Sequence, residues 1–303
     1  MSERRFNVLR GEEVVFSPHR QGRTLEPEAA DCPLCPTRPG GRVTEIPVES
    51  FEIAVFDNRF PSFAAPQGAA EVVVYTDQHQ GSFAALPARR AEALMWVWRD
   101  RYAELGGRDG VEYVMPFENR GVEVGTTLHH PHGQVYAFPF LPPVPAAERD
   151  ADRRRGGCTP CDLNEQELGE AERLVYENGS FTAYVPFAAR WPYEVLVSAR
   201  DHVPSLLDAG AAELRDLADA LQAVTRGYDS LFDAPFPYIL CVHQAPTDDI
   251  GGGHLHVELY SPVRAPGKLK HLAGCEQGAG TMLMDVLPEA TAAELRTAIE
   301  RAA

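Results

Sequence analysis

The run His129-His130-Pro131-His132-Gly133-Gln134 has a shorter counterpart late in the chain, His254-Leu255-His256-Val257-Glu258. Each run follows a Cys-x-x-Cys pair, a histidine and an amphipathic segment, in that order. The preceding landmarks are Cys32-Pro33-Leu34-Cys35 and His79 in the first case, and Cys158-Thr159-Pro160-Cys161 and His202 in the second. The separations between these landmarks nearly agree. The same order at the same spacing indicates an internal repeat, so two homologous halves are expected.

Short runs rich in β-branched residues predict strands at 52–56, 71–75, 111–117 and 135–138, and again at 181–185, 194–198, 238–242 and 254–258. Each half also carries one apolar stripe at helical spacing, within 87–105 and 209–232. These patterns predict an α+β fold of two tandem halves, each an antiparallel sheet with a helix packed on it. The halves span 1–145 and 156–303, and the Pro-, charge- and Gly-rich segment 142–157 joins them.

The composition excludes several classes of protein. The chain has 303 residues, of which 44% are hydrophobic and 24% charged, so wholesale disorder is excluded. Its net charge of −16 disfavours nucleic acid and anionic membranes as partners. No stretch reaches the about 18 apolar residues of a membrane span, and the first residues lack the apolar core of a secretory signal. We therefore expect a cytoplasmic protein.

The two Cys-x-x-Cys pairs indicate metal or redox chemistry rather than structural disulfides in a reducing compartment. Zinc held by two cysteines needs two further ligands, and the repeated histidines supply them. Four protein ligands leave no position for water, so both ions would be structural. Reduced thiols without metal are the alternative, and a thioredoxin-type dithiol is disfavoured because neither pair is expected between a strand and a helix. The predicted zinc ligands are Cys32, Cys35, His79 and His130 for one site and Cys158, Cys161, His202 and His254 for the other.

The run around His132 suits nucleophilic chemistry. Side chains two residues apart on an extended segment share a face, so His130, His132 and Gln134 are expected to point the same way. Pro131 stiffens the run, and Gly133 is expected to let an anion approach the backbone. An imidazole with one free nitrogen can attack phosphorus, and a neighbouring amide can donate to the phosphoryl oxygens. His132 is therefore the candidate nucleophile; a metal ligand or a buried structural histidine is the alternative.

The run His130-Pro131-His132-Gly133-Gln134 resembles the signature of the galactose-1-phosphate uridylyltransferases, a branch of the histidine-triad superfamily. Nearly the whole chain takes part in this resemblance. Further landmarks of that family match at 15–20, 117–119, 188–193, 236–238 and 270–276. The resemblance implies two histidine-triad-like halves and a zinc-containing transferase of galactose metabolism.

The resemblance also implies a ping-pong transfer of UMP from UDP-glucose to galactose 1-phosphate, through a uridylyl group on His132. Gln134 would donate to the α-phosphoryl oxygens; it stands where histidine-triad hydrolases carry a third histidine, which argues against hydrolysis. The residues implied for the nucleotide and phosphate site are Asn58, Asn119 and Thr127. Those implied for the sugar phosphate, across the interface of a homodimer, are Arg20, Arg23, Lys270 and Glu276.

The chain departs from the family pattern in places. Thr126 and Thr127 stand where well-known members carry Cys and Ser, and both changes are mild. His271 replaces an aromatic residue and Cys275 a tyrosine in the C-terminal substrate segment, so the acceptor sugar stays open.

The sequence leaves the identity of the second metal and the exact activity open. Some members hold iron on Glu and three His, and Glu148, His243 and His256 could supply part of such a site. The second cysteine pair favours zinc on His202 and His254 instead, and Glu258 argues against a catalytic role for His256. A nucleotide-sugar or dinucleoside-polyphosphate phosphorylase, or an adenylyltransferase, using the same histidine is the alternative enzyme. A non-catalytic zinc-stabilised binding module is the alternative outside enzymes.

Overall fold

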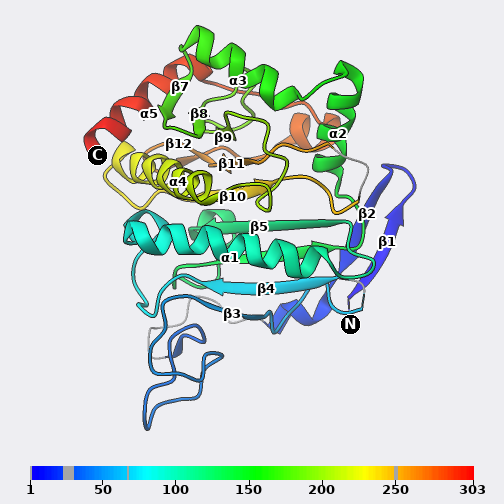
Figure 1. Cartoon of the computed structure of the whole chain (residues 1–303), viewed down its shortest axis with the longest axis vertical. Coiled ribbons are helices and arrows are strands. Elements are labelled where there is room, and N and C mark those ends of the chain that lie inside the picture. The colour runs from blue at the N-terminus through cyan, green and yellow to red at the C-terminus, as the bar shows by residue number, and fades with distance from the viewer. Residues whose placement is uncertain (1, 23–30, 67, 249–251) are drawn as a thin grey trace.

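Strands from both halves of the chain form one nine-stranded sheet in the computed structural model, which describes residues 2–22, 31–66, 68–248 and 252–303 (Figure 1). Its order is β3-β4-β6-β5-β10-β11-β9-β8-β7, and every neighbouring pair is antiparallel. The strands are β3 Ala54–Asp57, β4 Ala69–Val74, β5 Tyr113–Arg120, β6 His132–Phe138, β7 Leu174–Glu177, β8 Phe181–Tyr184, β9 Val195–Ala199, β10 Tyr238–His243 and β11 His256–Tyr260.

The strand order makes the repeat visible. From the central β5–β10 pair, the neighbours on one side are β6, β4 and β3, and those on the other are β11, β9 and β8. Each half therefore contributes the same arrangement of strands, and the two arrangements join edge to edge. The predicted antiparallel α+β fold is confirmed, with the two half-sheets fused into one.

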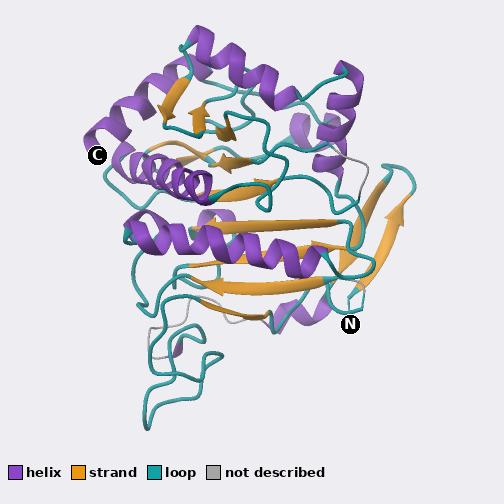
Figure 2. Ribbon diagram, in the orientation of Figure 1, coloured by secondary structure: helices purple, strands orange, loops and turns teal. Residues whose placement is uncertain are grey.

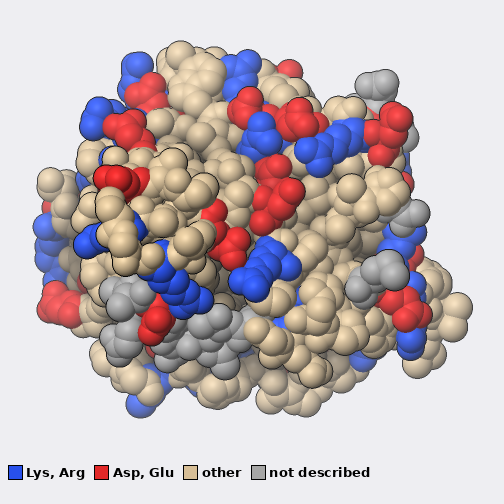
Figure 3. Space-filling model, turned by 90° about the horizontal axis from the view of Figure 1, so that it is seen from below, with Lys and Arg blue, Asp and Glu red and all other residues tan. Residues whose placement is uncertain are grey.

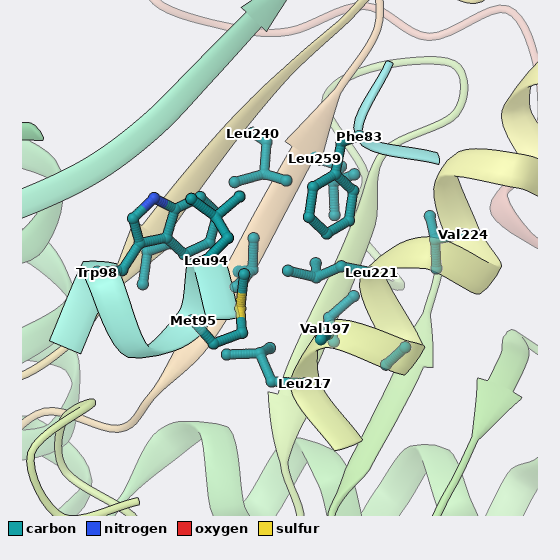
Figure 4. Close-up of a cluster of buried hydrophobic side chains, with 14 of the residues drawn as sticks. Phe83, Leu94, Met95, Trp98, Val197, Leu217, Leu221, Val224, Leu240 and Leu259 are labelled. Atoms are coloured by element: carbon teal, nitrogen blue, oxygen red, sulfur yellow. The ribbon is translucent and has the colours of Figure 1, made fainter. Parts of the chain in front are cut away.

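The helices α1 Ala88–Gly106 and α4 Ala211–Leu231 cover the same face of the sheet, one per half (Figure 1). Both predicted helices are thus confirmed to within a few residues. Leu94 and Trp98 of α1 meet Leu217 and Leu221 of α4 in one continuous apolar core (Figure 4). Burying these side chains contributes about 2 kcal/mol each, so the shared core holds the halves together.

Several elements were not predicted from the sequence. The joining segment 142–157 is mostly helix α2, Pro143–Arg155, rather than an irregular connection. Prolines are compatible with the first turn of a helix, because the backbone N–H groups there have no partner within the helix. Gly156 then ends α2 with a φ of 71°, which suits glycine. Also unpredicted were β7, α3 Thr159–Glu170, α5 Pro288–Ala302, the short pair β12 Val263–Ala265 and β13 Lys268–Leu269, and an N-terminal hairpin of β1 Glu3–Asn7 and β2 Glu12–Phe16.

The hairpin stands apart from the main sheet, and the segment before β3 is largely loop (Figure 2). Acidic and basic side chains are interspersed on the face that Figure 3 presents. In the part of the chain that the structure describes, no helix combines the length and apolar character needed to cross a bilayer.

Candidate active site and metal clusters

Strand β6 places the predicted nucleophile in a cavity. The strand begins at His132, so the alternation of side chains puts His132 and Gln134 on one face. Both line a cavity of about 360 Å³, together with Asn58 and Thr127, which the sequence also predicted. His130 precedes the strand and turns elsewhere, so the expectation that it shares this face is wrong. We call this space the nucleophile cavity.

A hydrogen bond to the backbone holds the His132 ring. Its Nδ1 lies 2.7 Å from the carbonyl oxygen of His130, to which an Nδ1–H donates. This hydrogen bond fixes the tautomer and leaves the lone pair of Nε2 free. Burial lowers the pKa of His132, while the hydrogen bond to His130 opposes that shift. The ring is therefore neutral at pH 7, and Nε2 can attack.

Gln134 is oriented by Asn58. The Nδ2 of Asn58 donates to Oε1 of Gln134 over 3.0 Å, and the Oδ1 of Asn58 accepts from the backbone N–H of Phe60 over 2.8 Å. Because Oε1 of Gln134 already accepts this hydrogen bond, the NH₂ group of Gln134 remains as the donor. That is the group needed to stabilise charge on a phosphoryl oxygen beside His132.

Gly133 is required for a reason other than the expected one. A Cβ at this position would overlap the hydroxyl of Tyr75 and lie 2.8 Å from the carbonyl oxygen of Phe117. His132 and Gln134 point into the cavity, so the missing side chain of Gly133 would point to the opposite, buried face. The glycine accommodates the tyrosine beneath the strand, rather than an anion above it.

Arg20 and Asn119 lie on the same side of the sheet but not in the cavity wall. Arg20 donates to Ser62 and, over 3.1 Å, to the hydroxyl of Tyr136, which is two residues beyond Gln134 on β6. Asn119 is two residues beyond Phe117, the β5 partner of Gln134. Arg23 lies outside the described residues.

Lys270 and Glu276 come together, but outside the wall of the nucleophile cavity. The Nζ of Lys270 lies 3.0 Å from Oε1 of Glu276, and both side chains are nearly buried. Among the described residues, neither lines the nucleophile cavity.

Two arginines in the cavity wall were not predicted. Arg42 and Arg59 line the nucleophile cavity and bring positive charge to a strongly acidic protein. Arg59 pairs loosely with Glu45 over 3.3 Å, at the surface. Both lie in loops that flank β3 in the sequence, and no motif in the sequence marks them. Guanidinium groups here suit a diphosphate.

The first predicted set of metal ligands assembles as expected. Nδ1 of His79 lies 3.4 Å from Sγ of Cys35, and Nδ1 of His130 lies 3.6 Å from Cys35 and 3.9 Å from Cys32. A zinc tetrahedron with ordinary bond lengths has N–S edges of about 3.5 Å. Nε2 of His130 donates to the carbonyl oxygen of Thr76 over 2.7 Å, which turns Nδ1 to the sulfurs. These residues, the first Cys–His cluster, could hold a metal.

The second set repeats this geometry. Nδ1 of His254 lies 3.3 Å from Cys158 and 3.4 Å from Cys161, and His202 lies 3.7 Å from Cys161. Nε2 of His254 donates to the carbonyl oxygen of Ala199 over 2.8 Å. Cys158 caps helix α3 and Cys161 lies in its first turn, so this pair opens a helix, which the sequence did not predict. This second Cys–His cluster could also hold a metal.

Glu148, His243 and His256 form a separate cluster, which we call the acidic trio. The sequence offered the acidic trio and the second Cys–His cluster as alternative sites for the second metal, but both groups of residues assemble in the structure. His254 faces the cysteines, whereas His256, two residues on, lies 3.8 Å from Glu148. Nδ1 of His243 lies 2.9 Å from Glu148, and both histidines hold the pKa of that carboxyl below its usual range. Helix α2, which carries Glu148, thus closes over the position that corresponds to His132.

Comparison with known proteins agrees with this geometry. Family models for the N-terminal and C-terminal domains of galactose-1-phosphate uridyl transferase match residues 62–142 and 150–301. The chain is 39% identical to the galactose-1-phosphate uridylyltransferase of Thermotoga maritima over 98% of both chains, and 40% identical to that of Streptomyces lividans over 81% of this chain and 70% of the other.

Solved structures show the same relationship. A uridylyltransferase structure superimposes with a TM-score of 0.87 at 31% identity over 99% of both chains. An ADP-glucose phosphorylase from Arabidopsis thaliana shares the fold, with a TM-score of 0.75 at 20% identity over 98% of both chains. The repeat, the nucleophile cavity and these matches agree, and the chain belongs to the galactose-1-phosphate uridylyltransferase family.

Proposed function

We propose that the chain transfers UMP from UDP-glucose to galactose 1-phosphate by a ping-pong mechanism, in galactose metabolism. The observation that carries this proposal is the pairing of a free Nε2 on His132 with a directed NH₂ group on Gln134 in one cavity. Membership of a uridylyltransferase family supplies the substrate class. Arg42 and Arg59 offset the negative charge of the diphosphate.

The first half-reaction needs no proton transfer. Nε2 of His132 forms a bond to the α-phosphorus as the bond to the bridging oxygen breaks, and glucose 1-phosphate leaves with that electron pair. The imidazole carries a positive charge, which the hydrogen bond from Nδ1 to the His130 carbonyl oxygen stabilises. Gln134 donates to a non-bridging oxygen while charge accumulates there. A phosphate oxygen of galactose 1-phosphate then attacks, and His132 leaves as neutral imidazole.

Incubation with UDP-glucose alone tests the function. We expect release of glucose 1-phosphate equal to the amount of enzyme, together with a uridylyl adduct on His132 by peptide mass spectrometry. ADP-glucose and diadenosine polyphosphate serve as matched donors. If only these adenine donors label His132, the phosphorylase or adenylyltransferase alternative replaces our proposal. If no donor labels the protein, the binding-module alternative replaces it.

We assign structural zinc to both Cys–His clusters, because soft thiolates with imidazoles are the donor set that zinc prefers. The acidic trio offers harder ligands and could supply part of the iron site that some members of the family hold. Elemental analysis of the purified protein should give about two zinc ions per chain, and Cys158→Ser about one. If the alternative holds and the trio binds iron, that iron would be lost with Glu148→Gln and kept in Cys158→Ser. Unchanged zinc in Cys158→Ser would refute the second zinc site.

The remaining assignments are part of the same proposal. Asn58 and Thr127 contact the nucleotide from the cavity wall, and Asn119 does so from the adjacent strand. Arg20, Arg23, Lys270 and Glu276 serve the sugar phosphate in a homodimer, where the partner's C-terminal segment completes the site. None of the six cysteines forms a disulfide, which supports the expected cytoplasmic location.

A further inference from the structure

Two buried polar side chains lie directly beneath the catalytic strand. Tyr75 follows β4 and is fully buried, and Glu118 on β5 is 4% exposed. Among the described residues, the hydroxyl of Tyr75 and Oε2 of Glu118 have no hydrogen-bond partner of good geometry. Buried polar atoms without partners are costly, by about 1–3 kcal/mol each, so a feature of this kind calls for an explanation.

The Tyr75 hydroxyl occupies the space that a side chain at position 133 would fill. It therefore supports the backbone of Gly133 from below, between His132 and Gln134. The backbone N–H of Tyr75 also donates to the carbonyl oxygen of Pro131 over 3.1 Å, just before the strand. Tyr75 thus contacts the catalytic run at two points without entering the nucleophile cavity.

Glu118 lies beside Tyr75 and is itself anchored. Its Oε1 accepts a hydrogen bond from the hydroxyl of Tyr238 on β10 over 3.1 Å. Arg120 lies over the Tyr238 ring and pairs with Asp229 of α4 over 2.7 Å. Glu118 and Tyr75 lie close enough that each shifts the pKa of the other.

We propose that Tyr75 and Glu118 are positioning residues. They support the backbone of Gly133 from the buried face of the sheet and so orient His132 and Gln134 toward the α-phosphorus. This inference rests on the proposed function. The ionised carboxylate of Glu118 accepts from both tyrosines at once; the protonated carboxyl gives up one acceptor position and releases Tyr75. A displacement of the strand by a fraction of an ångström changes the distance from Nε2 to phosphorus, and rate is steeply sensitive to that distance.

The titration of Glu118 gives the pair a measurable signature. Burial raises the pKa of Glu118 to about 7, against the lowering effects of Arg120, Tyr238 and Tyr75. Asp229 faces it only through Arg120. The first half-reaction should therefore slow as pH falls through about 7.

Single-turnover labelling of His132 by UDP-glucose, followed from pH 5.5 to about 9, tests the proposal. Tyr75→Phe should lower the labelling rate about tenfold, with the concentration of UDP-glucose at half-maximal rate unchanged. Glu118→Gln should abolish the rate change near pH 7. Tyr184→Phe is the matched control, because Tyr184 is also buried with an unpaired hydroxyl but lies on β8 of the other half. Its labelling rate should equal that of the wild type.

A wild-type labelling rate in Tyr75→Phe would overturn the proposal, as would a pH profile that Glu118→Gln leaves unchanged. An equal loss in Tyr184→Phe would also overturn it, because the effect would then be one of stability. If Glu118→Gln fails to fold, Tyr75→Phe decides the question on its own. Wild-type protein that takes no label from UDP-glucose refutes the proposed function instead, so the two failures are distinguishable.

Discussion

His132→Ala is expected to lower the rate of uridylyl transfer by about 10⁴-fold or more, since without the nucleophile no covalent intermediate forms. The ring donates to the His130 carbonyl oxygen and belongs to neither Cys–His cluster. The variant should therefore fold, keep its zinc and bind UDP-glucose. Intact-mass spectrometry after mixing with UDP-glucose should show no adduct, while equilibrium dialysis still shows binding.

His129→Ala provides the matched control for this prediction. His129 is an exposed neighbour in the same run and does not line the nucleophile cavity. Its removal should leave both the adduct and the steady-state rate near wild-type values. A uridylyl adduct that persists in His132→Ala would assign the nucleophile to another side chain. An equal loss in both variants would indicate a general disturbance of the run.

The sequence predicted the parts of the site whose residue types determine their chemistry. Cysteine and histidine at repeated spacing have few other uses, so both Cys–His clusters could be assigned from spacing alone. Gln134 could be placed beside His132 because two-residue alternation on a strand is a local rule. The rule failed for His130 because β6 begins only at His132.

The parts that could not be predicted depend on tertiary placement. Helix α2 carries prolines in its first turn and charged residues along its length, and no apolar stripe marks it. Its position is set by distant contacts, such as that of Arg149 with Asp248 over 2.7 Å. In the sequence, Tyr75 and Glu118 are indistinguishable from ordinary strand residues. Their relation to the catalytic run becomes visible only in the structure, where the Tyr75 hydroxyl fills the space beside Gly133.

The metal clusters should differ in what they do for catalysis, although both stabilise the fold. Cys35→Ser is expected to lower the free energy of unfolding by roughly 4 kcal/mol or more, because a bound structural zinc contributes directly to folding. It should also lower the labelling rate of His132 in protein that is still folded. His130 explains this second effect, since its ring belongs to the first cluster and its carbonyl oxygen holds Nδ1 of His132 over 2.7 Å. Thermal unfolding and single-turnover labelling, both well below the melting temperature, measure the two effects.

Cys161→Ser in the second cluster separates stability from positioning. It should cost a similar free energy of unfolding, but His254 in that cluster adjoins His256, which faces Glu148 and not the nucleophile cavity. Labelling of His132 in folded Cys161→Ser protein should therefore stay near the wild-type rate. If Cys35→Ser keeps the wild-type melting temperature, the first zinc does not stabilise the fold. If Cys35→Ser and Cys161→Ser slow labelling equally, the carbonyl group of His130 does not link the metal to the nucleophile.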